Sequence, residues 1–230
     1  MTPSPIHHPS VQSDTGNRLR IDDLAMMRGG MSLIEALHLR LDAGQLMFLR
    51  GANGSGKTTF LRGLARLIPI TQGQFAINGI INTADQSALM RQIILIGHRN
   101  AGLEHLNVTD SLRLMASLMD MDISQQQIIA ALDHMGITAL AHRQMNQLSA
   151  GQQRRVALSR LVLAAPQTHR LWLIDEPFNA LDDAAISQLC DLITTYCHHG
   201  GTAIISGHGH MPLRPDATLT LGTKPQGVVT

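Results

Sequence analysis

Eight consecutive residues near position 50 could bind a phosphate group. They are Gly51, Ala52, Asn53, Gly54, Ser55, Gly56, Lys57 and Thr58, and they fit the pattern G-x-x-x-x-G-K-[ST]. The glycines let the backbone curl until its N–H groups point at phosphate oxygens. We expect Lys57 to reach the β- and γ-phosphates of a nucleotide and the Thr58 hydroxyl to bind Mg²⁺. The segment is therefore interpreted as a P-loop.

The segments on either side of the P-loop support this interpretation. Leu46–Leu49 is a short apolar run that predicts a buried strand, and Thr59–Leu67 has helix-forming character. A helix that begins here would aim its positive N-terminal end at the phosphates, and we include Thr59 in the site. A chance match in a glycine-rich loop is the alternative, and the strand and helix together disfavour it.

Two carboxylates follow another apolar run. Leu171–Ile174 predicts a buried strand, with Asp175 and Glu176 directly after it. We expect Asp175 to lie at the C-terminal edge of this strand, beside the P-loop, where it holds the water shell of Mg²⁺. Glu176 would then orient or deprotonate the attacking water. A solvated acidic turn is the alternative, and the nearby P-loop disfavours it.

A segment of small and polar residues precedes a predicted helix over Val156–Leu163. It contains Ser149, Gly151 and Gln152. Small residues at a helix start expose backbone N–H groups that can bind an anion. An ordinary capped helix explains these residues as well, so both interpretations stay open at this point.

Composition and segment order predict one α/β domain. The 230 residues are 44% hydrophobic and 15% charged, which indicates a folded globular protein. A net charge of +1 and 3% aromatic residues argue against nucleic-acid binding. Apolar strands, among them Ile93–Ile96 and Thr202–Ile205, alternate with helices. We therefore predict a P-loop NTPase core with a parallel sheet, an N-terminal antiparallel β subdomain formed by a meander of strands, and an all-helical insert at about 100–165.

The sequence also predicts the limits of this domain and the state of its cysteines. We expect a single domain over residues 18–222, a disordered tail at 1–17 and a C-terminal tail at 223–230. No apolar run approaches the ~20 residues that cross a bilayer, and the N-terminus is not a secretory signal. Cys190 and Cys197 fall on a helix predicted from about Asp183 to His198. They would lie about 10 Å apart along its axis, so we expect free thiols.

Taken in order, these motifs resemble those of ABC-transporter ATPase subunits, over about residues 19–222. The resemblance adds the Asn179–Asp182 segment and His208 to the motifs above. It implies ATP hydrolysis by a head-to-tail dimer, with ATP between the P-loop of one protomer and Ser149, Gly151 and Gln152 of the other. It also implies that Asp182 belongs to a loop linking the two sites and that His208 contacts the γ-phosphate.

Two positions depart from the usual pattern of that family. The loop after Ile93–Ile96 carries Gly97 and His98 where a glutamine usually touches Mg²⁺. Imidazole is a poor ligand for this hard cation, so we expect His98 to act through water or through a partner. Arg28 stands where an aromatic residue usually stacks on adenine, and a guanidinium plane can also stack on a base.

A closer resemblance is to the ATPase subunits of the cytochrome c maturation, or heme exporter, system. It rests on Ile96–His98 with Gly102, on Leu148–Leu158 and on Leu171–Phe178. It implies separate integral membrane subunits that act on heme or on a heme-loaded chaperone. It also implies a peripheral location on the cytoplasmic face of the bacterial inner membrane. Because the chain has no Cys-x-x-Cys-His, we expect it not to bind heme directly.

Other functions stay open. The chain could be the ATPase subunit of another small-solute ABC transporter, a soluble ABC ATPase of DNA repair or translation, or a P-loop kinase. Soluble ABC ATPases usually join two ATPase domains or carry long extensions, and a kinase would not need the Ser149–Gln152 segment.

The predicted helices between Thr109 and Arg143 are rich in methionine. Leu112, Met115, Leu118 and Met119 recur at helical spacing, which is typical of a core face. Flexible methionines also suit a groove that receives a helix. The family resemblance implies that a membrane subunit docks here, on positions exposed among Met115, Met119 and Met121.

Overall fold

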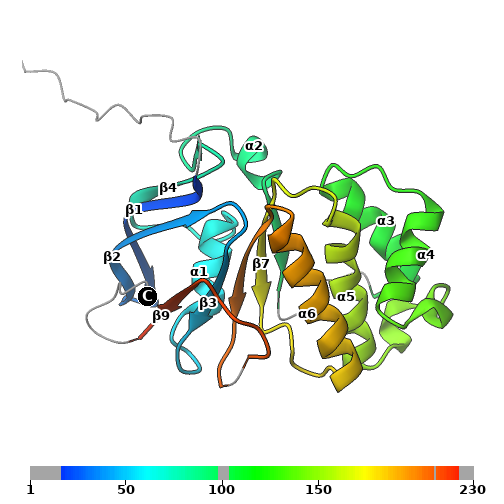
Figure 1. The fold of residues 1–230 in the computed structure, drawn as a ribbon. Helices are drawn as coiled ribbons and strands as arrows, with labels where there is room; N and C mark the ends of the chain where they lie inside the picture. The colour runs from blue at the N-terminus through cyan, green and yellow to red at the C-terminus, as the bar shows by residue number, and fades with distance from the viewer. Residues whose placement is uncertain (1–16, 98–103, 210, 223–230) are drawn as a thin grey trace, which may run out of the picture.

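The computed structural model describes residues 17–97, 104–209 and 211–222, and a parallel sheet lies at their centre (Figure 1). The strand order in this sheet is β6-β7-β8-β3-β9. The strands are β3 (Leu46–Arg50), β6 (Ile93–Ile96), β7 (Leu171–Asp175), β8 (Thr202–Ser206) and β9 (Ala217–Thr220). Four of them were predicted within one residue. β9 was not predicted, because its alternation of threonine with two apolar residues gives a weak strand signal.

A second, antiparallel sheet forms the N-terminal part of the described chain, with strand order β2-β1-β4-β5. Its strands are β1 (Asn17–Arg28), β2 (Met31–Asp42), β4 (Gln72–Ile77) and β5 (Ile80–Ile81). Gly29 and Gly30 close the β1–β2 hairpin with φ values of 56° and 80°. The predicted N-terminal antiparallel subdomain is confirmed. β3 does not continue the meander, because it pairs with β8 and β9 in the parallel sheet.

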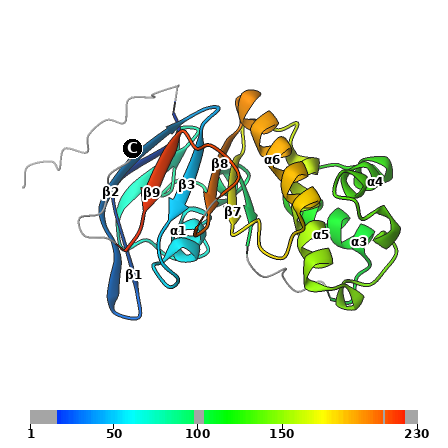
Figure 2. The same ribbon diagram turned by 60° about the horizontal axis from the view of Figure 1, so that its bottom comes forward.

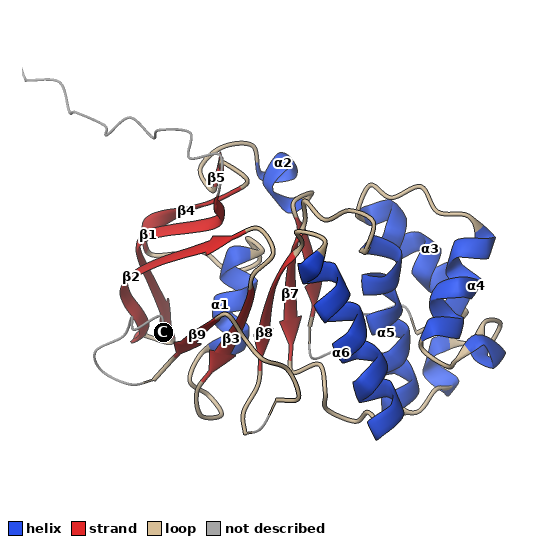
Figure 3. Cartoon of the chain, viewed as in Figure 1, coloured by secondary structure: helices blue, strands red, loops and turns tan. Residues whose placement is uncertain are grey.

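The described residues form six helices, drawn in blue in Figure 3. They are α1 (Lys57–Leu64), α2 (Gln86–Met90), α3 (Val108–Leu118), α4 (Gln125–His134), α5 (Ala150–Ala164) and α6 (Asp183–His198). Short 3-10 turns lie at Thr138–Leu140 and Met145–Gln147. The predicted bounds of α6 are confirmed. α1 begins two residues before the predicted Thr59, because the P-loop passes directly into the helix.

Side chains cap the insert helices α3 and α4 at their N-termini. Ser124 caps α4, and its hydroxyl accepts a hydrogen bond from the Gln127 N–H. Asn107 caps α3, and its side-chain oxygen accepts from the Asp110 N–H at 2.8 Å. Both side chains supply the acceptor that a helix start needs.

Side chains alternate between the two faces of the parallel sheet and build a separate core on each face. On β7, Leu171 and Leu173 pack with α1 and the antiparallel sheet, while Trp172 and Ile174 pack with α5 and α6. Figure 2 shows α1 enclosed between the two sheets. Since both faces of β7 are buried, its sequence is a continuous apolar run, and this is why it could be predicted.

The helices α3, α4 and α5 lie together on one side of the molecule, within the predicted insert of about 100–165 (Figure 1). Leu112 is buried in the core, as expected, but Leu118 is 72% exposed. Met121 is only 6% exposed, so it is not one of the exposed docking positions among Met115, Met119 and Met121. The chain turns inward after α3 and packs the Met121 side chain against the α5 side of the core.

The chain termini and the cysteines can be compared with the expectations from the sequence. β1 begins at Asn17, so the last residue of the predicted N-terminal tail belongs to a strand. The rest of that tail and the predicted tail at 223–230 lie outside the described residues. Cys190 and Cys197 are free thiols, as expected. Within the described ranges, no helix combines the length and apolar character that a membrane span requires.

Candidate active site

The P-loop connects the end of β3 to the start of α1. Gly51 has a φ of 145°, and an added Cβ there would meet the Leu221 carbonyl oxygen at 2.7 Å. Gly56 is the N-cap of α1 and has a φ of 100°. L-residues rarely adopt these values, so glycine lets the chain make the tight curl between strand and helix. The curl leaves the N-terminus of α1 directed at the space inside the loop, where an anion would be favoured.

Lys57 lies inside this curl rather than in solvent. Its side chain is 5% exposed, and Nζ donates hydrogen bonds to the carbonyl oxygens of Gly51 at 2.8 Å and Ala52 at 3.1 Å. The ammonium group is therefore held at the centre of the loop, beside the N-terminus of α1. This is the position at which a positive charge can meet a phosphate bound by the loop.

A hydrogen bond joins the P-loop to the end of β7. Thr58 Oγ1 donates to Asp175 Oδ2 at 2.8 Å. The other carboxylate oxygen accepts from the Ser206 hydroxyl at the end of β8. Asp175 is 1% exposed, so two hydroxyl groups replace the water that its carboxylate would otherwise bind. The structure therefore brings together the two residues that were predicted as Mg²⁺ ligands.

Glu176 has an unusual backbone conformation. Its φ is 48°, in the left-handed region that few non-glycine residues occupy. Such a conformation costs of the order of 1–3 kcal/mol and persists only where the surroundings fix it. The Glu176 N–H donates to the Ser206 hydroxyl at 3.0 Å, and Oε2 accepts from Asn179 Nδ2 at 2.9 Å. Both the main chain and the carboxylate of Glu176 are therefore held in place.

These residues share one cleft with a volume of about 550 Å³. Its lining residues come from the P-loop, the end of β7, the loop after β8 and the end of β1, and they include Arg28, Asn53, Gly54, Gly56, Lys57, Thr58, Thr59, Asp175, Glu176, Asn179 and His208. His208 is exposed two residues after β8, and Arg28 is exposed at the end of β1. P-loop residues, the two carboxylates and His208, which were predicted to bind or hydrolyse the nucleotide, therefore line the same cleft, and so does Arg28.

The Ser149–Gln152 segment lies elsewhere. Ser149 is the N-cap of α5 and forms a capping box with Gln152, in which each side chain accepts from the other's backbone N–H. Gly151 is required because an added Cβ would meet the Ala180 carbonyl oxygen at 2.8 Å. These three residues line a separate hollow with Asp182, which forms an ion pair with Arg155. One chain alone does not bring this segment to its own P-loop.

Sequence reasoning missed two residues of the site. Ser206 contacts both Asp175 and Glu176, as described above. Arg154 is buried and donates to the Asp175 carbonyl oxygen at 2.6 Å. The only sequence signal for Ser206 is a polar residue at the end of an apolar run, and Arg154 lies in a pair of arginines at a helix start. His98 lies outside the described residues, so its predicted role stays a prediction.

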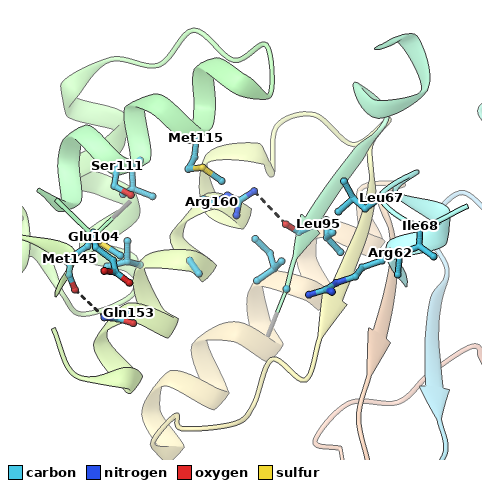
Figure 4. Close-up of a pocket in the computed structure, with 15 residues that line it drawn as sticks. Arg62, Leu67, Ile68, Leu95, Glu104, Ser111, Met115, Met145, Gln153 and Arg160 are labelled. Carbon is cyan, nitrogen blue, oxygen red and sulfur yellow. Dashed lines mark hydrogen bonds between the residues drawn. The ribbon is translucent and has the colours of Figure 1, made fainter. Parts of the chain in front are cut away.

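Another hollow, distinct from the cleft and from the hollow at Ser149, lies between the helical insert and the parallel sheet (Figure 4). Its volume is about 410 Å³, and we call it the groove. Its lining includes Arg62, Leu67, Leu95, Glu104, Leu112, Met115, Met145, Gln153 and Arg160. Arg160 Nη2 donates to the Leu95 carbonyl oxygen at 3.3 Å, and burial lowers its pKa to about 10. The predicted groove beside the methionine-containing helices is therefore present, with Met115 on its wall.

Comparisons with known proteins identify the family of the chain. The family model described as ABC transporter matches residues 34–179. The cytochrome c biogenesis ATP-binding export protein CcmA of Albidiferax ferrireducens is 37% identical over 83% of this chain and 89% of its own length. The protein of the same name from Pseudomonas putida is 37% identical over 86% of this chain and 92% of its own length.

A solved structure supports the fold. It is a dimeric ATP-binding cassette in a post-hydrolysis state with ADP and Pi, and it matches 88% of this chain and 94% of its own with a TM-score of 0.77. At 23% sequence identity this likeness shows the fold alone, and it confirms the predicted P-loop core. With the family model and the curated relatives, it follows that the chain belongs to the ABC transporter family and is an ATPase of that family.

Proposed function

We propose that this chain is the ATP-hydrolysing subunit of a membrane complex for c-type cytochrome biogenesis, which exports heme or releases a heme-loaded chaperone. The observation that carries the ATPase role is the Thr58–Asp175 hydrogen bond at 2.8 Å, because it joins the P-loop to the carboxylates at the end of β7. The cytochrome c assignment is supported by relatives that are 37% identical and named for that process.

ATP binding is assigned to the P-loop, from Gly51 to Thr59. The backbone N–H groups at the start of α1 bind the phosphate oxygens, and Lys57 exchanges its hydrogen bonds to loop carbonyls for bonds to the β- and γ-phosphates. Arg28 lies on the wall of the same cleft and stacks on the adenine ring.

The residues present fit a bound Mg²⁺. Thr58 Oγ1 and Asp175 Oδ2 are oxygen atoms only 2.8 Å apart, and Mg²⁺ prefers oxygen ligands. We assign Thr58 as a direct ligand and Asp175 to the ion's water shell. When bound, this ion neutralises charge on the β- and γ-phosphates.

Glu176 is the proposed general base. Its carboxylate lies on the wall of the cleft and is oriented by Asn179, so it can accept a proton from the water that attacks the γ-phosphate. His208, from the loop after β8, donates a hydrogen bond to a γ-phosphate oxygen. Hydrolysis then releases ADP and inorganic phosphate.

A second protomer completes the site. Ser149, Gly151 and Gln152 line a different hollow from the P-loop, so one chain alone leaves them without a nucleotide. In a head-to-tail dimer they contact the γ-phosphate held by the other protomer, while Asp182 links the two sites. The first turn of α5, which begins at Ala150, carries backbone N–H groups of the kind that can bind an anion, as this contact requires.

The groove is the proposed docking place for a membrane subunit. Its apolar wall and the flexible Met115 side chain suit a short helix from that subunit. The chain then lies on the cytoplasmic face of the bacterial inner membrane, held by protein contacts alone. It binds neither nucleic acid nor heme itself.

The test is a strain in which Glu176→Gln is the only copy of this chain. We expect c-type cytochromes to lose their heme-bound form, while the variant protein is present at its usual level. Cys190→Ser, a half-buried change on α6 at a residue that does not line the cleft, serves as the matched control. Normal amounts of holo-cytochrome c in the Glu176→Gln strain would reject the cytochrome assignment and favour an ATPase of another small-solute transporter.

A further inference from the structure

Arg154 contacts three carbonyl oxygens in two separate backbone segments. Its guanidinium donates to the carbonyl oxygens of Gly97 at 2.7 Å, Asp175 at 2.6 Å and Pro177 at 3.5 Å. The side chain is 5% exposed, on the first turns of α5. In the described part of the chain, all of its hydrogen bonds therefore go to main-chain carbonyls behind the cleft.

Two of these carbonyls lie on either side of Glu176. The Asp175 carbonyl belongs to the peptide group just before it, and the Pro177 carbonyl follows it. Glu176 between them has the left-handed φ of 48°. A planar guanidinium with several N–H donors can hold both carbonyls at once, which a single ammonium group does poorly.

The third carbonyl belongs to Gly97, the residue after β6. Gly97 also lies on the wall of the groove. Arg154 therefore joins the groove wall to the main chain of the proposed general base through one rigid side chain. Gln153, the residue before it, lines the groove as well and donates to the Met145 carbonyl oxygen at 3.0 Å.

The charge of Arg154 is part of this arrangement. Burial lowers the pKa of the guanidinium, and the nearby carboxylates of Asp175 and Glu176 act in the opposite direction. A neutral side chain of similar size would remove the Arg154 donors from three carbonyls and a positive charge from behind two carboxylates.

We propose that Arg154 is a positioning residue for ATP hydrolysis. It holds the Glu176 main chain in its left-handed conformation, and it passes a displacement of Gly97 at the groove to the general base. This inference rests on the proposed role of Glu176.

Arg170 offers a matched control at the opposite end of β7. It is also buried, at 4% exposure, and it donates to a main-chain carbonyl, that of Met119, at 2.7 Å. It lies before the first residue of the strand, whereas Arg154 contacts the last. Arg170→Met therefore tests the loss of a buried, carbonyl-bound arginine without disturbing the cleft.

The experiment measures ATP turnover by the full chain in complex with its membrane subunits. We expect Arg154→Met to lower kcat on the order of 100-fold, as a small displacement of a reacting group does, with nucleotide affinity changed by less than about threefold. Arg154→Lys keeps the charge but loses the planar fork, and we expect an intermediate kcat. Arg170→Met should keep kcat near the parental value, even if its melting temperature falls.

A double variant separates positioning from general damage. If Arg154 acts through Glu176, then adding Arg154→Met to Glu176→Gln should lower kcat by less than about threefold more. A full additional loss in that background would overturn the proposal, as would equal losses of kcat in Arg154→Met and Arg170→Met.

Two further outcomes are decisive. If Arg154→Met does not fold, Arg154→Lys carries the test, and a parental kcat in that variant overturns the proposal. If the parental complex itself does not hydrolyse ATP, the proposed function fails and the inference fails with it. A parental complex that is active, with an equally active Arg154→Met variant, rejects the inference alone.

Discussion

The cleft and the groove are built by different means. In the cleft, the main chain shapes the site: Gly51, Gly56 and Glu176 all have positive φ, and Lys57 is held by loop carbonyls. The groove is shaped by side chains from the helical insert and from the sheet, Met115 among them (Figure 4). A site set by the backbone suits chemistry that requires fixed geometry, whereas a methionine-containing surface can adapt to a partner.

The first prediction tests the cleft at the proposed base. Glu176→Gln should lower the rate of ATP hydrolysis by roughly 10²–10⁴-fold, because the attacking water loses its proton acceptor. ATP binding should persist, since the P-loop is unchanged, and an ATP-bound dimer should accumulate. The rate is measured as phosphate release, and the dimer by size-exclusion chromatography with ATP. Near-parental turnover would remove Glu176 from the mechanism.

The second prediction tests the cleft at the P-loop. Lys57→Ala removes charge-assisted hydrogen bonds to phosphate, which should weaken nucleotide affinity by about 10–100-fold. This variant should differ in kind from Glu176→Gln, because it loses binding rather than turnover of bound ATP. Titration with a fluorescent ATP analogue measures the affinity. An unchanged dissociation constant would contradict the position assigned to the ammonium group.

The third prediction tests whether the groove binds the membrane subunit. Met115→Glu places a charge on its apolar wall, so the affinity for the membrane subunit should fall by about tenfold or more. The chain should shift from the membrane to the soluble fraction while its nucleotide affinity stays unchanged. Met90→Glu, at a 44% exposed methionine on α2 outside the groove, is the matched control. Equal release of both variants would mean that added charge, and not the groove, decides the location.

The smallest expected effect concerns a buried thiol on α6 that lines neither the cleft nor the groove. Burial raises the pKa of the Cys197 thiol from 9.0 to about 12, and Asp216 adds to the rise. Between these values the unfolded thiol loses its proton while the folded one keeps it, so stability falls as the pH rises above 9. We expect a loss of about 1 kcal/mol at a pH of ~10. Urea unfolding of the parent and of Cys197→Ala at pH ~8 and ~10 measures it, and an equal pH slope in both would assign the loss to other groups.

The sequence predicts most of the residues that line the cleft, but few of the buried residues that hold them in place. The P-loop and the Leu171–Asp175 strand carry local constraints, a backbone curl and burial on two faces, which restrict residue types at adjacent positions. Arg154 carries no such signal, because the carbonyls of Gly97 and Asp175 that it contacts are 57 and 21 residues away. The burial of Met121 carries no such signal either, because it depends on where the chain turns after α3, which helical spacing does not reveal.

The most direct test of the division between cleft and groove is a comparison of ATPase rates with and without the membrane subunits. If the cleft carries out hydrolysis and the groove couples it to the membrane subunits, Met115→Glu should keep the parental basal rate. The same variant should lose the stimulation of ATPase activity by the subunits. Under the same conditions Glu176→Gln should lose both rates. If Met115→Glu lowered basal and stimulated rates by the same factor, or kept full stimulation, the separate roles assigned to these two regions would be contradicted.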